Sequence, residues 1–490
     1  MSADRLSSRA SATELAKGVR VEGPCVFHMT MPQTVAKNVT AAPELARDLK
    51  VSHAASIVVG TIIGSGIFLV PKEMMQAVGS AHLVYLAWIV GGLLSFFGAL
   101  SYSELAAMKP QAGGEYVYMR DGYGPLGGFL YAWTYFVLAK PGSMATIAIG
   151  LVRILGTFSF LAILPQPMMT RPFLITWGQL VAIAAVLFIS FINYVGVKKA
   201  GEFQLFFTLL KVAIILAIVG VGFAYAHGDL ANFATRYLGA RGGFAGFMVA
   251  LIAALWAYDG WNLVTTVAGE IKQPQRSLPI ALILGVATVA VLYMLVNAAV
   301  QYVMPAAAVA ASPRPASDAM QLAMGAAGAA IVSAGMAISM LVTLNGSTMT
   351  GARVPFALAR DRYFFQGLAK VHPRFHTPST ALVVQAILAI MFLLFAGSFQ
   401  ELFSVTLFGE WLFYMLVTST VFIFRWREPN AERPYKTWGY PVVPGLFMVA
   451  SAVLLYYTFS ANLRNSFVGS ALILAGVPVF YAFQRRRASA

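Results

Sequence analysis

A few polar residues lie inside long apolar runs of this chain, where they could bind a ligand. Gly64-Ser65-Gly66 interrupts one run, Asp259-Gly260 interrupts another, and Lys211 and Glu410 lie within two more. Each glycine weakens a helix by about 1 kcal/mol relative to alanine. An interrupted helix is tolerated in hydrocarbon only where the freed backbone is buried in protein or lines a cavity. The chemistry these residues offer is the binding of charged groups by half-helix ends and buried ionisable side chains.

The composition is that of a membrane protein with many spanning helices. The chain has 490 residues, of which 59% are hydrophobic and 11% charged, with a mean hydropathy of +0.73. No soluble domain of this length needs so much apolar surface, so we expect one helical membrane domain. The single cysteine, Cys25, excludes an internal disulfide and a cysteine-based metal site. The sequence holds no metal-ligand cluster and no Walker loop, so we expect no metal, no cofactor and no direct use of ATP.

Apolar runs of spanning length predict about twelve transmembrane helices. They fall at 53–75, 82–108, 126–152, 172–195, 202–225, 244–268, 278–303, 326–357, 379–397, 402–425, 440–461 and 465–484. The first fifty residues lack a long apolar run and predict a disordered cytoplasmic tail rather than a cleaved signal peptide.

Lysine and arginine are distributed unevenly between the two sides of the predicted bundle. With the N-terminus inside, 25 of them face the cytoplasm and 7 face the opposite side, while Lys140 and Lys211 remain within apolar runs. This asymmetry predicts that both termini are cytoplasmic. It also explains the net charge of +15 by topology, so we expect contact with membrane lipid and no binding of nucleic acid.

The two interrupted runs are the first and the sixth, five helices apart. With five helices in each half, the second half starts from the opposite side of the membrane, as in an inverted repeat. Paired interrupted segments indicate a transporter site at the midplane. We therefore predict a tail at 1–50, repeats at 51–225 and 244–425, two further helices at 438–484 and a basic C-terminus at 485–490. Close helix packing through small residues is the alternative interpretation of Gly64-Ser65-Gly66.

Several blocks of this sequence resemble the amino acid–polyamine–organocation superfamily, and most closely bacterial members of the L-type amino acid transporter family. The resemblance covers about residues 50–484 and rests on blocks spread over the chain. These are Gly60-Thr61-Ile62-Ile63-Gly64-Ser65-Gly66-Ile67-Phe68, Pro110-Gln111-Ala112-Gly113-Gly114-Glu115-Tyr116, Ala257-Tyr258-Asp259-Gly260-Trp261-Asn262, the segment Glu270 to Pro279, Asn345-Gly346-Ser347 and Ala352-Arg353.

The resemblance implies an all-α fold of the LeuT-like type. Such a fold has five helices, five inverted helices with interrupted helices 1 and 6, and here two more at the C-terminus. It also implies alternating access and zwitterionic or related amino acids as substrates, often moved by exchange. Relatives in eukaryotes are linked by a disulfide to a heavy subunit through a cysteine between helices 3 and 4. Residues 152–172 contain none, so we expect no such subunit.

An amino acid presents a carboxylate and an ammonium group, and the two breaks offer partners for both. Ser65, Gly66 and Ile67 open the second half of helix 1 and would supply N–H donors to the carboxylate, with Gly64 and Gly66 letting the ligand approach the backbone. The ammonium needs carbonyl oxygens. Those of Ile62 and Ile63, and of Trp256 with Ala257, would supply them, in the arrangement that the resemblance implies.

Three side chains beside the breaks have two interpretations each. Trp256 stands where the family places an aromatic that covers the substrate, or is an ordinary packed aromatic. Asp259 contacts substrate, or caps a half-helix. Glu410 contacts substrate or carries a proton, or makes a structural hydrogen bond between helices.

A second set of charged residues lies at the predicted cytoplasmic ends of the helices. They form a cytoplasmic gate or are solvated charges, and they are Glu104, Glu115 and Glu270 with Arg276 and Arg353.

Lys211 matches the family's helix 5 lysine, which bridges broken helix 1 to helix 8. A buried ammonium there would occupy the volume that a sodium ion takes in sodium-coupled relatives of the fold. Ser339 and Asn345 offer it polar partners, and snorkelling to an interface is the alternative. Lys140 precedes Pro141-Gly142, which predicts a local break in helix 3.

The leading prediction is a sodium-independent exchanger of L-amino acids in the cytoplasmic membrane. A proton-coupled symporter, with Glu410 or Lys211 titrating, is the first alternative. An amino acid sensor that does not transport is the second. A membrane enzyme would need a nucleophile and a base side by side, and the few intramembrane ionisable residues offer no such pair.

Overall fold

The computed structural model describes residues 44–169, 175–225, 227–395, 399–461 and 463–488. Cys25 and most of the predicted tail lie outside these residues. The α-helices are α1 (Val51–Ile62), α2 (Gly66–Val78), α3 (Ala81–Met108), α4 (Glu115–Thr134), α5 (Lys140–Leu155), α6 (Trp177–Val195), α7 (Val197–Ala224), α8 (Gly243–Ala257), α9 (Pro274–Val303), α10 (Ala306–Ala311), α11 (Pro315–Met324), α12 (Ala326–Gly351), α13 (Arg353–Arg360), α14 (Ser379–Phe395), α15 (Phe399–Arg427), α16 (Val442–Ala461), α17 (Leu463–Leu474) and α18 (Gly476–Ala488). Shorter elements are η1 (Tyr135–Ala139), η2 (Ser159–Leu161), η3 (Leu230–Ala234), η4 (Trp261–Glu270), η5 (Gln366–Ala369) and the antiparallel strands β1 (Pro167–Met169) and β2 (Ile175–Thr176).

Helices occupy all twelve predicted ranges. Within the described residues, ten helical segments are long and apolar enough to cross a membrane, and they include α3, α6, α7 and α9. The 17-residue helix α14 is apolar but shorter, and α15 occupies the remaining range. The chain is therefore a multi-pass helical membrane protein. The predicted arrangement of twelve spans as five plus five remains a prediction.

Helix α7 shows that lipid, not water, is the solvent of this bundle. Its side chains Phe206, Leu209 and Leu216 are exposed, whereas Gln204 and Lys211 are buried. This is the reverse of a helix in a soluble protein, because in hydrocarbon the polar groups must find partners inside the protein.

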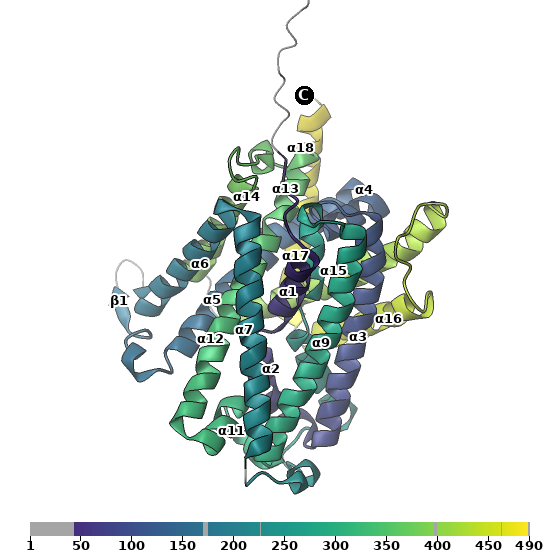
Figure 1. The fold of residues 1–490 in the computed structure, drawn as a ribbon. Coiled ribbons are helices and arrows are strands. Elements are labelled where there is room, and N and C mark those ends of the chain that lie inside the picture. Colours follow the sequence, from purple (N-terminus) through teal and green to yellow (C-terminus); the bar gives the residue numbers. More distant parts are fainter. Residues whose placement is uncertain (1–43, 170–174, 226, 396–398, 462, 489–490) are drawn as a thin grey trace, which may run out of the picture. The chain divides into compact units, whose positions relative to one another are not determined.

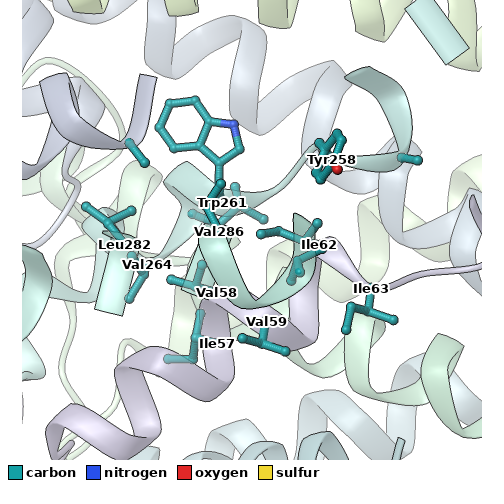
Figure 2. Packing of buried hydrophobic residues seen from close by; sticks show 14 of the residues in the cluster. Ile57, Val58, Val59, Ile62, Ile63, Tyr258, Trp261, Val264, Leu282 and Val286 are labelled. Atoms are coloured by element: carbon teal, nitrogen blue, oxygen red, sulfur yellow. The ribbon is translucent and has the colours of Figure 1, made fainter. Parts of the chain in front are cut away.

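Helices α1 and α2 follow one another through the middle of the bundle in Figure 1. Helix α1 packs against α7, α9, α12 and η4. Figure 2 shows the apolar contact, in which Ile57, Val58 and Ile62 of α1 lie beside Val264 of η4 and Val286 of α9. The interrupted helix is thus held on its apolar side by tight packing, which fixes the position of its free ends.

The third predicted transmembrane helix, at 126–152, is irregular where the sequence predicts a local break. A π-helical turn, η1, directly precedes Lys140, and α5 begins there with Pro141 in its first turn. Proline has no N–H and crowds the carbonyl four residues earlier, so the helix widens locally instead of continuing with regular hydrogen bonds.

Candidate functional site

The first break lies between the end of α1 at Ile62 and the start of α2 at Gly66. Ile63 leaves the helical conformation with ψ of 88°. The last carbonyls of α1 then have no partner within the helix. The Lys211 ammonium supplies one, since its Nζ donates to the Gly60 oxygen at 2.9 Å and to the Ile63 oxygen at 2.6 Å. A positive charge therefore lies at the negative end of the α1 dipole.

Two hydroxyls of α12 join Lys211 on the same carbonyls. Ser339 Oγ donates to the Ile63 oxygen at 2.6 Å, and Thr343 Oγ1 lies 3.2 Å from the Gly60 oxygen. Ser339 thus meets Lys211 through a shared carbonyl. Asn345 differs from the expectation, because its amide bonds Asn193 at 2.8 Å and Gln204 at 2.7 Å rather than Lys211. The shared carbonyls link α7 and α12 to the end of α1.

The second break lies between α8 and η4. Gly260 has a φ of 99°, which only glycine adopts without strain, and the chain resumes as a 3₁₀-helix rather than an α-helix. Thr61 Oγ1 donates to the Gly260 oxygen at 2.9 Å, so the two breaks touch. Gly260 is the N-cap residue of η4 and has no side chain, and the Asp259 carboxylate just before it accepts a hydrogen bond from Tyr414. Capping of η4 by Asp259 and contact with substrate both stay predictions.

Tyr293 of α9 connects the two breaks, and sequence reasoning missed it. Its hydroxyl lies 3.0 Å from the Ile62 oxygen and 2.9 Å from the Ala257 oxygen. The single hydroxyl proton of Tyr293 is thus shared between the carbonyl oxygens of Ile62 and Ala257, the last residues of α1 and α8. A lone tyrosine in an apolar run resembles an ordinary core aromatic, so only its partners reveal this role.

A cavity of about 350 Å³ opens where the breaks meet. This volume lies within the range of small-molecule sites. Of the predicted site residues, the lining includes Ile62, Gly64, Ser65, Gly66, Trp256, Ala257, Asp259 and Glu410. Ile63 and Ile67 lie outside the lining. The Ile63 carbonyl accepts from Lys211 and Ser339 instead. Of the residues predicted to supply carbonyl acceptors, Ile62, Trp256 and Ala257 line the cavity.

A polar network extends from the cavity to the α3–α4 connection. Asp259 accepts a hydrogen bond from the Tyr414 hydroxyl at 2.7 Å, and that hydroxyl also lies 3.1 Å from Asn262 Oδ1. Asn262 donates to Glu115 at 2.9 Å, and Glu115 is fully enclosed. Burial raises the pKa of the Glu115 carboxyl, against the opposing effect of hydrogen bonds from Tyr131, Tyr102 and Asn262. Glu115 is therefore part of a buried network rather than a solvated charge.

The end of η4 is joined to α13 by an ion pair. Arg353 donates from Nε and Nη2 to the two oxygens of Glu270, at 2.7 and 2.9 Å, and both side chains are 0% exposed. Glu104 accepts similarly from Arg425, whereas Arg276 is exposed. Of the charges predicted as a gate, Glu270 and Arg353 pair with each other and Glu104 pairs with Arg425, whereas Glu115 accepts from neutral donors and Arg276 is exposed.

Arg353→Met should destabilise the protein by about 3–5 kcal/mol, because it leaves the Glu270 carboxylate buried without its partner. Unfolding of the purified protein by denaturant measures the loss. Lys198→Met is the matched control, since Lys198 and Glu202 form a pair 3.9 Å apart that is 65% and 58% exposed. We expect the control to stay within about 0.5 kcal/mol of the parent protein. Equal stabilities for the two variants would contradict the role given to the buried pair.

Two interrupted helices that meet at a cavity define a membrane carrier of small molecules. Residues 49–483 match the amino acid permease family model, and the chain belongs to that family, whose members are transporters rather than enzymes. The serine/threonine exchanger SteT of Bacillus subtilis (strain 168) is 30% identical over 452 residues, which cover 91% of this chain and 98% of SteT. The b(0,+)-type amino acid transporter 1 of Homo sapiens is 30% identical, covering 84% of this chain and 82% of that protein. The human cystine/glutamate transporter is 28% identical, with 90% and 86% covered.

Proposed function

We propose that this protein is a sodium-independent secondary transporter that exchanges L-amino acids across the cytoplasmic membrane by alternating access. The observation that carries the proposal is the meeting of the two helix breaks at one cavity, with the Lys211 ammonium bound to the carbonyl end of α1. Exchange is also the activity named for SteT, which this chain resembles over nearly its full length. The LeuT-like arrangement of five plus five helices with two more belongs to the same proposal.

The cavity offers complementary groups for the two charges of an amino acid backbone. The first N–H groups of α2, at Gly66 and Ile67, have no partner within their helix and lie at its positive end. The carbonyls of Ile62 and Ala257 lie at the negative ends of α1 and α8. A carboxylate at Ser65-Gly66 would bond the free N–H groups of α2, and an ammonium would share the carbonyls of Ile62 and Ala257 with the Tyr293 hydroxyl. Trp256 lines the same cavity and would cover the bound molecule.

The side from which the cavity is reached follows from its lining and from the basic residues. From the breaks the cavity extends to Glu73 and Arg153, which the distribution of basic residues assigns to the outside. On the predicted inner side, Glu270 and Arg353 link η4 to α13. We infer an outward-facing state, with both termini in the cytoplasm. We also propose that the protein works without a disulfide-linked heavy subunit.

Amino acid uptake into reconstituted vesicles should be equal in sodium and choline buffers, because the Lys211 ammonium takes the place of a coupling cation. Preloading the vesicles with unlabelled amino acid should stimulate uptake of label several-fold. An inward proton gradient applied to empty vesicles should drive no accumulation.

Each alternative to exchange predicts a different result in these vesicles. Accumulation driven by the proton gradient alone would favour the proton-coupled symporter, for which Glu410 in the cavity wall is the candidate carrier. Binding of amino acid without any flux would favour a sensor.

A further inference from the structure

Residues 44–50, which precede α1 on the predicted cytoplasmic side, form no helix and are here called the inner strap. The strap is joined to the connection between η4 and α9 through Leu49, which pairs with Ile271 as an isolated parallel β-bridge. The Leu49 N–H donates to the Glu270 oxygen at 3.0 Å, and the Lys272 N–H donates to the Leu49 oxygen at 2.8 Å. Leu49 thus uses both of its backbone groups to bind this connection.

The side chain of Leu49 fits into a gap beside α7. It is 0% exposed, and a Cβ built on Gly201 would lie only 2.7 Å from Leu49 Cδ2. Such a close contact would force one of the two groups to move, so the glycine leaves the room that this leucine fills. Leu49 is therefore a wedge between α7 and the end of η4.

The other end of the inner strap contacts the connection between α13 and α14. The Ala46 N–H donates to the His376 oxygen at 3.4 Å, and His376 Nδ1 lies 3.0 Å from the Glu44 oxygen. The ion pair between Glu270 and Arg353 joins η4 to α13 as well. The strap and the ion pair therefore hold together the same two parts of the chain.

The contacts of the inner strap are of a kind that can be released. Apart from Leu49, its residues are exposed or half-buried, and the strap contributes only backbone groups to the bonds with the two connections. Water can hydrate these groups at the surface once they are freed, and no charge is left buried without a partner. Detachment of the strap therefore costs less than separation of Glu270 from Arg353.

The inner strap continues directly into α1, and the far end of α1 is the first break. Helix α1 has 12 residues and is about 18 Å long, so a movement of the strap is carried to the carbonyls at the break. In alternating access, the parts around a midplane site separate on one side at a time. Because the strap is bound to both connections, they can separate only after it has left one of them.

We propose that the inner strap is a latch, which keeps the cavity closed toward the cytoplasm while it is seated and must detach before the cavity opens on that side. The proposal rests on the proposed function, since a latch has a part only in a carrier that opens inward. It assigns Leu49 a role in the conformational cycle, although Leu49 does not line the cavity.

Thiol labelling from each face of the membrane tests the proposal. Cys25→Ser removes the single cysteine of the full-length chain, and Ser143→Cys places one in the cavity lining. An impermeant maleimide is applied to right-side-out and to inside-out vesicles, so that it enters the cavity from one face only. Leu49→Ala removes the wedge but keeps the backbone bonds. We expect it to speed labelling from the cytoplasmic face about tenfold or more and to slow labelling from the outer face, because the inward-open state becomes more populated.

Gly201→Ala tests the same contact from α7, since its Cβ would meet Leu49 and displace the inner strap. Cytoplasmic labelling should again be faster, but the substitution should add little in a Leu49→Ala background, where the gap is already open. Val51→Ala is the matched control. Val51 lies two residues after Leu49 but is 40% exposed, so labelling should keep the rate of the Ser143→Cys protein.

Thermal unfolding shows which variants are folded, and Gly201→Ala decides alone if Leu49→Ala is not. Unchanged labelling in the folded variants would overturn the proposal and leave the inner strap as an anchor without a part in the cycle. Faster labelling from both faces would also overturn it, because that result indicates general loosening rather than release of a latch. The labelling needs no substrate. If the parent protein neither binds nor exchanges amino acids, it is the proposed function that fails.

Discussion

Gly64→Val should abolish amino acid exchange and lower the affinity for substrate by two orders of magnitude or more, about 3 kcal/mol. Gly64 lines the cavity between the end of α1 and the start of α2. A Cβ built on it meets no atom closer than Thr343 Oγ1, at 4.0 Å. The added Cβ therefore has room beside the protein, and the valine side chain would occupy space that the substrate needs.

The stability of the variant separates blocked binding from misfolding. Thermal unfolding without ligand should be nearly unchanged in Gly64→Val, whereas the stabilisation by added amino acid should vanish. Gly64→Ala should give an intermediate loss. A substitution at Gly66 would be a less specific test of binding. A Cβ added there would lie 3.1 Å from both Cα and Cβ of Ala257 and would push α2 away from α8. Normal exchange by Gly64→Val would exclude the cavity as the substrate site.

Lys211→Met should slow exchange by about 100-fold or more, while the affinity for substrate changes only a few-fold. The substitution keeps the length of the side chain but removes the two charge-assisted hydrogen bonds to Gly60 and Ile63, each worth about 1.5–3 kcal/mol. Those bonds hold α1 to α7 and, through Ser339, to α12. Lys211 does not line the cavity, so the loss should affect the conformational cycle more than substrate contact.

Lys199→Met is the control for this effect, because Lys199 is an exposed lysine of the same helix. The Lys199→Met variant should exchange amino acids at the rate of the parent protein. Affinity is measured by thermal stabilisation and rate by exchange in vesicles of the same preparation. A tenfold weaker affinity together with an unchanged maximal rate would assign Lys211 to substrate contact instead.

The helices and the positions of both breaks are predictable from the sequence because their signals are local. Glycine and serine within an apolar run mark the break at Ile63–Ser65, and Asp259-Gly260 marks the second. The π-helical turn before Lys140 coincides with the break expected at Lys140-Pro141-Gly142. In each case the physical cause, a weak helix former or a missing N–H, lies in the residues themselves.

The partners of the buried polar groups are not predictable in this way. Tyr293 bonds Ile62 across 231 positions, and Ser339 bonds Ile63 across 276. Asn345 lies on the expected helix but faces Asn193 and Gln204. Residue types show that a polar group in hydrocarbon needs a partner, whereas the packing of helices decides which one it finds.

The tether of Lys211 to the protein backbone has a consequence for energetics. An ion bound from solution can be released on the far side and so performs work, but an ammonium fixed to α7 cannot leave the protein. In the proposed exchange of two zwitterions around it, no net charge moves, so the membrane voltage would neither drive nor oppose the cycle. In such a carrier, accumulation of one amino acid is limited by the concentration ratio of the one that leaves.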